Sequence, residues 1–123
     1  MIWICATCGV ETAELAEPPA SCAICSDERQ WVPASGQTWT TLGRLTEAGT
    51  TTEWLEVEPD LYGITAAPQV GIGQQTMVVR TDGGVLVFDP LGFVDEVAIG
   101  HIRTLGPVLA VAASHPHMYG CQT

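Results

Sequence analysis

Two Cys-x-x-Cys pairs near the N-terminus constrain this chain more than any other feature. Cys5 and Cys8 form the first pair, Cys22 and Cys25 form the second, and thirteen residues separate Cys8 from Cys22. Each pair is typical of a tight turn that places two sulfur atoms on one side, so two such turns can surround one ion. Four cysteines in this pattern are typical of a closed, tetrahedral zinc site. We therefore predict a structural zinc ion whose four thiolates leave no coordination position for a substrate.

The alternatives to zinc are a rubredoxin-like iron site, disulfides or free thiols. The start of the chain, Met1 to Cys5, has no basic segment followed by a long apolar one, so we expect no secretory signal and a cytoplasmic location. A reducing compartment disfavours disulfides. No apolar run approaches the roughly 18 residues of a membrane-spanning helix, so we expect no membrane partner.

The four cysteines define a predicted zinc-ribbon module over residues 1–35. Within it we expect a short strand at residues 2–4, a partner strand at residues 30–32 and an acidic connection over residues 11–17. So small a module cannot bury enough surface to fold alone, and a metal would supply the missing stability. A linker over residues 36–42 follows, and we expect residues 39–42 to return and pack on the module. Residues 43–123 form the second predicted domain.

The charge of the chain argues against nucleic acid as a partner. The formal net charge is −10, there is no lysine, and residues 1–60 hold ten of the fourteen carboxylates. Zinc ribbons often bind nucleic acid, but a surface this acidic would repel phosphates.

The second domain has the pattern of a β-meander followed by a helix and a strand. Alternating apolar residues predict strands over 54–58 and 61–65, and Asp82-Gly83 between two apolar runs predicts a hairpin of strands 76–81 and 85–88. Helical spacing of apolar residues continues from 93 to 105, where Gly106-Pro107 ends the helix. The apolar run 108–113 predicts a buried strand.

The segment Ser114-His115-Pro116-His117 follows that last strand directly. Residues two apart on an extended chain point the same way, and Pro116 favours extended geometry at His115. His115 and His117 can therefore reach one ion, which makes them candidate ligands of a second zinc or another divalent metal. The alternative is a turn in which both imidazoles are only hydrogen-bonded.

Three further side chains could carry chemistry, but each has a simpler interpretation. We interpret Cys121 as an incidental thiol rather than a ligand or nucleophile, His101 as a surface residue of the helix, and Asp89 as a turn former rather than a distant metal ligand.

Residues 76–117 resemble the N-terminal half of the metallo-β-lactamase fold. In that family a β-meander leads to a strand that ends in Asp and a Gly-containing turn, here Asp89 to Gly92, and then to a helix and a strand that ends in His-x-His-x-Asp-His. His115 and His117 match the first two histidines. Tyr119 and Gly120 stand where the family has the Asp and the His that hold its second metal.

The resemblance implies an α+β fold in which a small four-cysteine zinc ribbon precedes the β-rich N-terminal half of an αβ/βα sandwich. It implies a metal-dependent hydrolase, or a truncated and inactive member, with an unknown small-molecule substrate. The alternatives are a non-catalytic zinc-ribbon interaction protein and an iron electron-transfer protein. Because the family fold takes roughly twice the residues of the second domain, half a sandwich leaves one sheet face and an edge strand open. We therefore expect self-association or a partner that covers the sheet.

Overall fold

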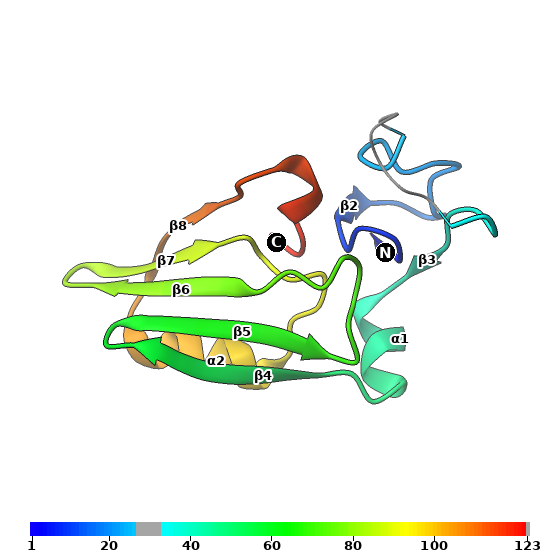
Figure 1. Ribbon diagram of the computed structural model, residues 1–123. Helices are drawn as coiled ribbons and strands as arrows, with labels where there is room; N and C mark the ends of the chain where they lie inside the picture. The colour runs from blue at the N-terminus through cyan, green and yellow to red at the C-terminus, as the bar shows by residue number, and fades with distance from the viewer. Residues whose placement is uncertain (27–32, 123) are drawn as a thin grey trace.

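The computed structural model describes residues 1–26 and 33–122, and this part of the chain is a mixed α+β structure dominated by two β-sheets (Figure 1). The strand predicted at residues 30–32 lies outside the described residues. No helix in the described part is long and apolar enough to cross a membrane.

The N-terminal sheet has three short antiparallel strands in the order β2-β1-β3. β1 (Ile2–Cys5) is the central strand, and it pairs with β2 (Glu11–Glu14) and with β3 (Trp39–Thr40). The predicted return of residues 39–42 to the module is thus confirmed for Trp39 and Thr40, whereas Leu42 begins α1. The acidic connection predicted from residue 11 is wrong for residues 11–14, because pairing with β1 draws them into a strand despite their polar character.

The larger sheet has five strands in the order β4-β5-β6-β7-β8, all antiparallel except for the parallel pair β7 and β8. Its strands are β4 (Thr51–Glu58), β5 (Leu61–Ala67), β6 (Thr76–Thr81), β7 (Gly84–Phe88) and β8 (Val108–Ala112). Helix α1 (Leu42–Glu47) precedes the sheet, α2 (Glu96–Leu105) connects β7 to β8, and a 3-10 turn η1 (Pro116–Met118) follows β8. The predicted hairpin is confirmed, whereas the last helix begins at Glu96 rather than at 93.

The core lies between the larger sheet and α2, which covers one face of it (Figure 1). Val78 and Val85 are fully buried on the sheet, and Ala98 meets them from the helix. Trp54 packs against this core and stacks on His101 of α2, with ring centroids 4.9 Å apart. His101 is exposed on the helix, as predicted, and its stacking on Trp54 joins α2 to β4.

The opposite face of the sheet carries apolar side chains that are partly or largely exposed. Cross-strand pairing aligns Leu55, Met77 and Phe88 in one row, and Val79 with Leu86 in the next. Leu55 is 60% exposed and Phe88 is 41% exposed. We call these five residues the apolar open face.

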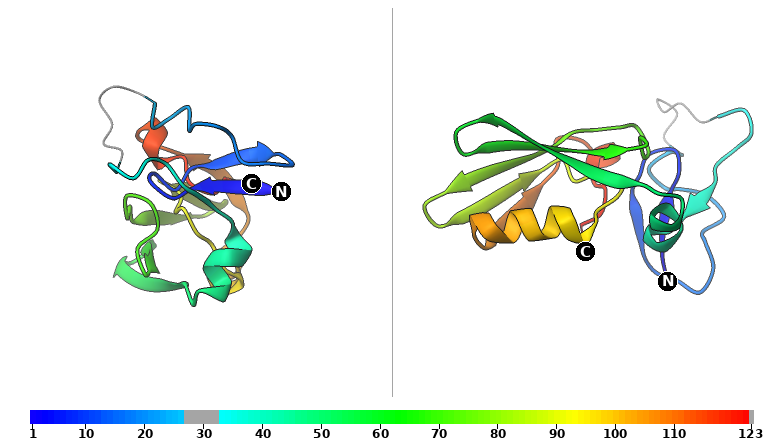
Figure 2. Two further views of the ribbon diagram at one scale, coloured as in Figure 1. Left: turned by 90° about the vertical axis from the view of Figure 1, so that its right-hand side faces the viewer. Right: turned by 90° about the horizontal axis from the view of Figure 1, so that it is seen from below.

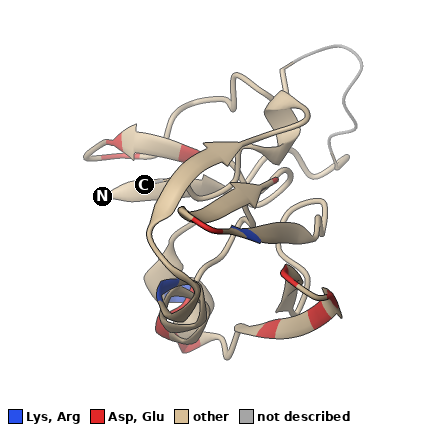
Figure 3. Ribbon diagram, turned by 90° about the vertical axis from the view of Figure 1, so that its left-hand side faces the viewer, with Lys and Arg blue, Asp and Glu red and all other residues tan. Residues whose placement is uncertain are grey.

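The two edges of the larger sheet differ in charge. β4 carries three glutamates, Glu53, Glu56 and Glu58, and charged side chains protect a sheet edge against pairing with another chain (Figure 3). β8 reads Val-Leu-Ala-Val-Ala and all five residues are exposed. The prediction of a buried strand is therefore wrong, because β8 lies at the edge with β7 as its neighbour.

Asp95 connects α2 to β4, the edge strand on the other side of the sheet from β8. Its carboxylate caps the helix by accepting the Ala98 N–H at 2.8 Å, and it also accepts the N–H and hydroxyl of Thr52 on β4. Burial by itself raises the pKa of Asp95, but these hydrogen bonds outweigh it and hold the pKa below its ordinary value of 3.8. The stabilising contribution is therefore present at neutral pH and is lost as the pH falls below about 4.

We expect Asp95→Ala to lower the free energy of unfolding by about 1–2 kcal/mol, because it removes a helix cap and leaves Thr52 without its acceptor. Urea denaturation at pH 7 measures this change. Glu96→Ala, one residue along and exposed, is the control and should change stability by less than about 1 kcal/mol. Equal effects of the two substitutions would contradict the capping role.

The N-terminal sheet lies against one end of the larger sheet (Figure 2). The contact is backbone against backbone and depends on three glycines, Gly9 after the first cysteine turn, Gly71 between β5 and β6, and Gly92 after β7. A Cβ at Gly71 would lie 2.6 Å from the carbonyl carbon of Cys8, and a Cβ at Gly92 would lie 2.8 Å from the Cα of Gly9. The cysteine module is therefore closely docked on the rest of the described chain.

Candidate metal centre and histidine pair

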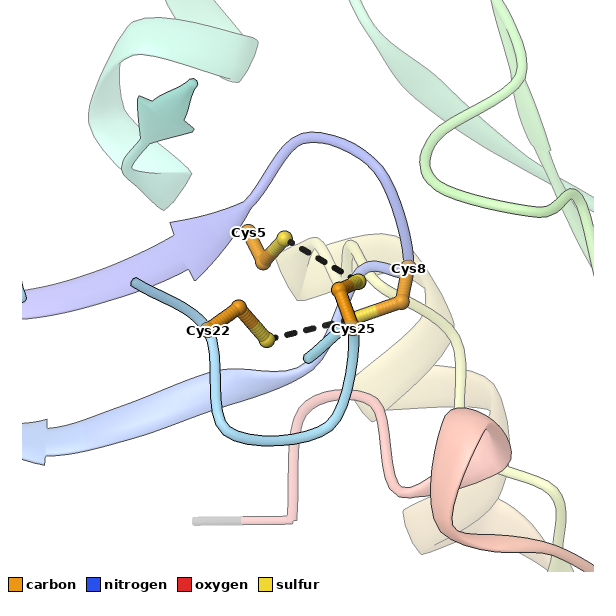
Figure 4. Close-up of side chains that lie close together, drawn as sticks. All are labelled: Cys5, Cys8, Cys22 and Cys25. Carbon is orange, nitrogen blue, oxygen red and sulfur yellow. Dashed lines mark hydrogen bonds between the residues drawn. The ribbon is translucent and has the colours of Figure 1, made fainter. Parts of the chain in front are cut away.

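The four N-terminal cysteines converge on one point, as their spacing predicts (Figure 4). Cys5 ends β1, Cys8 follows in the turn after it, and Cys22 and Cys25 form the second turn. Their sulfur atoms all lie within 4.8 Å of one another, and Cys5 and Cys8 are fully buried. No other group of three or more histidine, cysteine or acidic residues in the described ranges is arranged to hold a metal.

The sulfur–sulfur distances fit a tetrahedral metal site. The distance is 3.8 Å from Cys5 Sγ to Cys25 Sγ and 3.9 Å from Cys8 Sγ to Cys22 Sγ. Sulfurs that each lie about 2.3 Å from a zinc ion are about 3.8 Å apart in a regular tetrahedron. A disulfide would need about 2.05 Å. The donor set and its spacing therefore suit zinc, or iron in a tetrahedral thiolate site.

A cation is also needed to hold four thiolates together. The hydrogen bond between the Cys5 and Cys8 side chains lowers the pKa of Cys5 to about 5 and raises the pKa of Cys8. Burial raises the pKa of Cys25 to about 12. The four groups therefore do not all ionise at neutral pH by themselves, and a bound divalent ion would displace the remaining protons.

Hydrogen bonds with Ser26 and Gln37 hold the second cysteine turn. The Cys22 carbonyl accepts both the N–H and the hydroxyl of Ser26, at 2.9 and 2.7 Å, and the Cys22 N–H donates to the side chain of Gln37 at 2.8 Å. These bonds close the turn of residues 22–26, which contains Ile24.

His115 and His117 lie together at the carboxyl end of β8, in the turn η1. Their ring centroids are 4.4 Å apart and their Nδ1 atoms are 2.6 Å apart. His115 Nδ1 also accepts the backbone N–H of His117 at 3.2 Å. The two imidazoles lie together, with His115 exposed and His117 buried, but the predicted extended geometry holds only for His115, because residues 116–118 form a 3-10 turn.

The buried histidine contacts the cysteine module. His117 Nε2 lies 3.3 Å from the carbonyl oxygen of Ile24, which stands between Cys22 and Cys25. The tail after the histidines is held by the module as well, because Glu11 on β2 donates its N–H to the Gly120 carbonyl and accepts the Gln122 N–H. No sequence pattern marks these contacts, since they join residues about a hundred positions apart.

The structure gives a physical reason for glycine at position 120. Gly120 has φ +52 and is buried, and a Cβ there would collide with the carbonyl oxygens of Pro90 and Leu91. The adjacent Tyr119 is 40% exposed. No side chain fits at the position where the resembled family carries its last histidine, so position 120 contributes no ligand.

Asp89 and Cys121 both have structural surroundings. Asp89 has φ +54 and its carboxylate accepts the N–H and hydroxyl of Ser114, so it fixes the turn after β7 against the end of β8. Cys121 borders an apolar cavity of about 280 Å³ between α2 and the sheet. Burial raises the pKa of the Cys121 thiol to about 12, so it is a neutral thiol rather than a nucleophile at pH 7.

Comparison with known proteins identified a relative in Bacillus subtilis (strain 168). This relative, "Uncharacterized protein YmaE", is 41% identical to the chain over 121 residues. The alignment covers 98% of this chain and 44% of the relative, so the chain spans less than half of the relative's length. No family model and no solved structure match the chain.

Proposed function

We propose that this chain is the N-terminal part of a metal-dependent hydrolase of the metallo-β-lactamase type. The four-cysteine centre holds a structural zinc ion, and His115 and His117 supply two ligands of a second divalent metal. The observation that carries the proposal is the approach of the two Nδ1 atoms to 2.6 Å at the carboxyl end of β8. A metal in such a site supplies Lewis-acid chemistry for hydrolysis.

The order of elements supports this proposal. An antiparallel meander, a turn at Asp89, the helix α2 and the strand β8 precede the histidines in the order expected from the resemblance. Functional groups in layered folds gather at the carboxyl ends of strands, where loops shape a site. Asp89 fixes this end of the strand through Ser114.

The apolar open face and the uncharged edge β8 fit a sandwich whose second half lies outside this chain. The open face presents Leu55, Leu86 and Phe88, and β8 has no charged residue to discourage pairing. The Bacillus subtilis relative has more than half of its length outside the aligned region. We propose that such additional residues form the covering layer and provide the third ligand of the second metal.

The site that we propose holds one catalytic metal rather than two. Position 120 has no room for a side chain, and Tyr119 is a poor ligand at neutral pH. The 123 residues by themselves contribute two histidine ligands, so we expect no hydrolysis from this chain alone.

A second candidate is a zinc-ribbon interaction protein without catalysis. It is favoured by the metal-binding geometry, because the four-cysteine cluster has a complete ligand set within the described residues and the histidine pair does not. In this case the open face would bind a partner protein or a second copy.

A metal count separates the two candidates. We expect wild-type protein in excess zinc to bind two ions per chain, and His115→Ala/His117→Ala to bind one, because the four-cysteine centre does not use the histidines. Equilibrium dialysis followed by elemental analysis measures both values and also identifies the metal retained after purification.

His101→Ala is the matched control, because it removes an imidazole that lies on α2 and stacks on Trp54 rather than on the pair. It should leave two ions bound. One ion in both the wild type and the double variant would refute the second site and favour the interaction protein. Iron in the four-cysteine centre would be visible at once as colour in the purified protein.

A further inference from the structure

The environment of His117 links the cysteine module to the histidine pair. His117 is 6% exposed, and a buried imidazole needs partners for its ring nitrogens. On one side, Nε2 faces the Ile24 carbonyl oxygen at 3.3 Å, and on the other, Nδ1 faces His115 Nδ1 at 2.6 Å. In both contacts the donor or acceptor role of the ring nitrogen depends on which tautomer His117 adopts.

A carbonyl oxygen can only accept, so a hydrogen bond from His117 to Ile24 uses the tautomer with the hydrogen on Nε2. A neutral imidazole then has its lone pair on Nδ1. His115 Nδ1 also presents a lone pair in this arrangement, because it accepts the backbone N–H of His117. In the other tautomer the hydrogen lies on Nδ1 of His117 and is donated to His115 Nδ1, 2.6 Å away, which leaves His117 no lone pair for a shared metal ion.

This arrangement matches the way proteins orient metal-binding histidines. A ligating histidine commonly donates its other ring N–H to a carbonyl or carboxylate, which fixes its tautomer and orientation. In a tetrahedral site with metal–nitrogen distances of about 2.0–2.1 Å, the two nitrogens would separate to about 3.3 Å. That requires a movement of less than about 1 Å from the present positions.

We propose that the Cys22–Cys25 turn is a positioning element for the histidine pair. The Ile24 carbonyl accepts the Nε2–H of His117 and presents the His117 Nδ1 lone pair to a divalent metal shared with His115. The inference rests on the proposed function, because it concerns the metal site proposed there. It adds a regulatory consequence, since loading of the four-cysteine centre with metal strengthens metal binding at the histidines.

The docking contacts transmit this effect. Ser26 and Gln37 hold the turn that carries Ile24, and metal binding by Cys22 and Cys25 closes the same turn. Glu11 holds the tail beyond the histidines through its hydrogen bonds with residues 120 and 122. Loss of the metal from the four-cysteine centre therefore releases Ile24 and allows His117 to change its tautomer.

The first test is the tautomer of His117 in the full chain with zinc only in the four-cysteine centre. Nitrogen-15 NMR of the histidine rings, assigned with His101→Ala and His115→Ala, should show hydrogen on Nε2 of His117 and not on Nδ1. A pair held only by a hydrogen bond from the His117 Nδ1–H to His115 Nδ1 would show the opposite tautomer. Hydrogen on Nδ1 would overturn the positioning role.

The second test is a titration with Co²⁺, whose absorption spectrum differs between thiolate and imidazole sites. Zinc-loaded wild type should bind Co²⁺ at the histidines about 10- to 100-fold more tightly than Cys22→Ser/Cys25→Ser. Cys121→Ser, the same change outside the cluster, should match the wild type. If the double variant does not fold, the tautomer of His117 in the wild type is the measurement that decides the positioning role.

The outcomes distinguish this inference from the function on which it rests. No Co²⁺ uptake at the histidines of zinc-loaded wild type would refute the proposed metal site itself. Uptake with unchanged affinity in a folded double variant would refute only the role of the Cys22–Cys25 turn.

Discussion

Cys22→Ser is expected to abolish metal retention in the four-cysteine centre and to unfold the N-terminal sheet. Cys5, Cys8, Cys22 and Cys25 form the buried centre of this small sheet, and the three strands around it have two to four residues each. Structural zinc contributes about 10–16 kcal/mol of apparent binding free energy at pH 7, which exceeds what such a sheet can gain from burial alone. Elemental analysis and far-UV circular dichroism measure the two losses.

Cys121→Ser is the matched control, because it makes the same chemical change in a cysteine outside the cluster. It should retain about one metal ion per chain in the four-cysteine centre and the wild-type spectrum. A chelator strong enough to remove the ion from the wild type should reproduce the Cys22→Ser spectrum, and added zinc should reverse it. Full metal retention by Cys22→Ser would show that the cluster is not the site.

Local patterns predicted the parts of this protein whose geometry is local. A Cys-x-x-Cys turn places its two sulfurs by its own backbone, so the spacing alone predicted the convergence of the four cysteines. The hairpin of β6 and β7 follows from Asp82-Gly83 in the same way. The histidine pair was expected from an extended strand end, but the two rings meet through the 3-10 turn η1, in which only His115 is extended.

Features that depend on distant partners were not predictable in this way. Residues 11–14 have no apolar alternation, and they form β2 because the backbone of β1 offers them hydrogen bonds. The apolar run of β8 predicted burial, but burial requires a neighbour on both sides, and the strand order places β8 at an edge. A run of apolar residues shows what could be buried and not what covers it.

The contact between Ile24 and His117 illustrates the same limit at the candidate site. It uses a backbone carbonyl, which every residue has, so no residue type marks it in the sequence. Gly120 could have been noticed in the sequence, because a glycine at a position where the resembled family has a histidine indicates a special backbone requirement. Its nature, a close approach to Pro90 and Leu91, required the fold.

Gly71→Ala is expected to lower the free energy of unfolding by about 3 kcal/mol, and so to lower the melting temperature by roughly 10 °C. Gly71 has φ +61, which disfavours any residue with a Cβ, and the added carbon would lie 2.6 Å from both the carbonyl carbon of Cys8 and the nitrogen of Gly9. Both neighbours are backbone atoms of the cysteine turn, so they cannot rotate away as a flexible side chain would. Thermal and urea denaturation measure the loss.

Gly100→Ala provides a control with the opposite expected sign. Gly100 lies inside α2, is exposed, and has no atom within 4 Å of an added Cβ. Alanine there should stabilise the protein by about 0.5–1 kcal/mol, because it reduces the conformational entropy of the unfolded chain and favours the helix. If Gly71→Ala were as well tolerated as Gly100→Ala, the cysteine module would not be docked through Gly71. The proposed effect of the four-cysteine centre on His117 would then be transmitted only through the contacts that Ile24 and Glu11 make with the C-terminal residues.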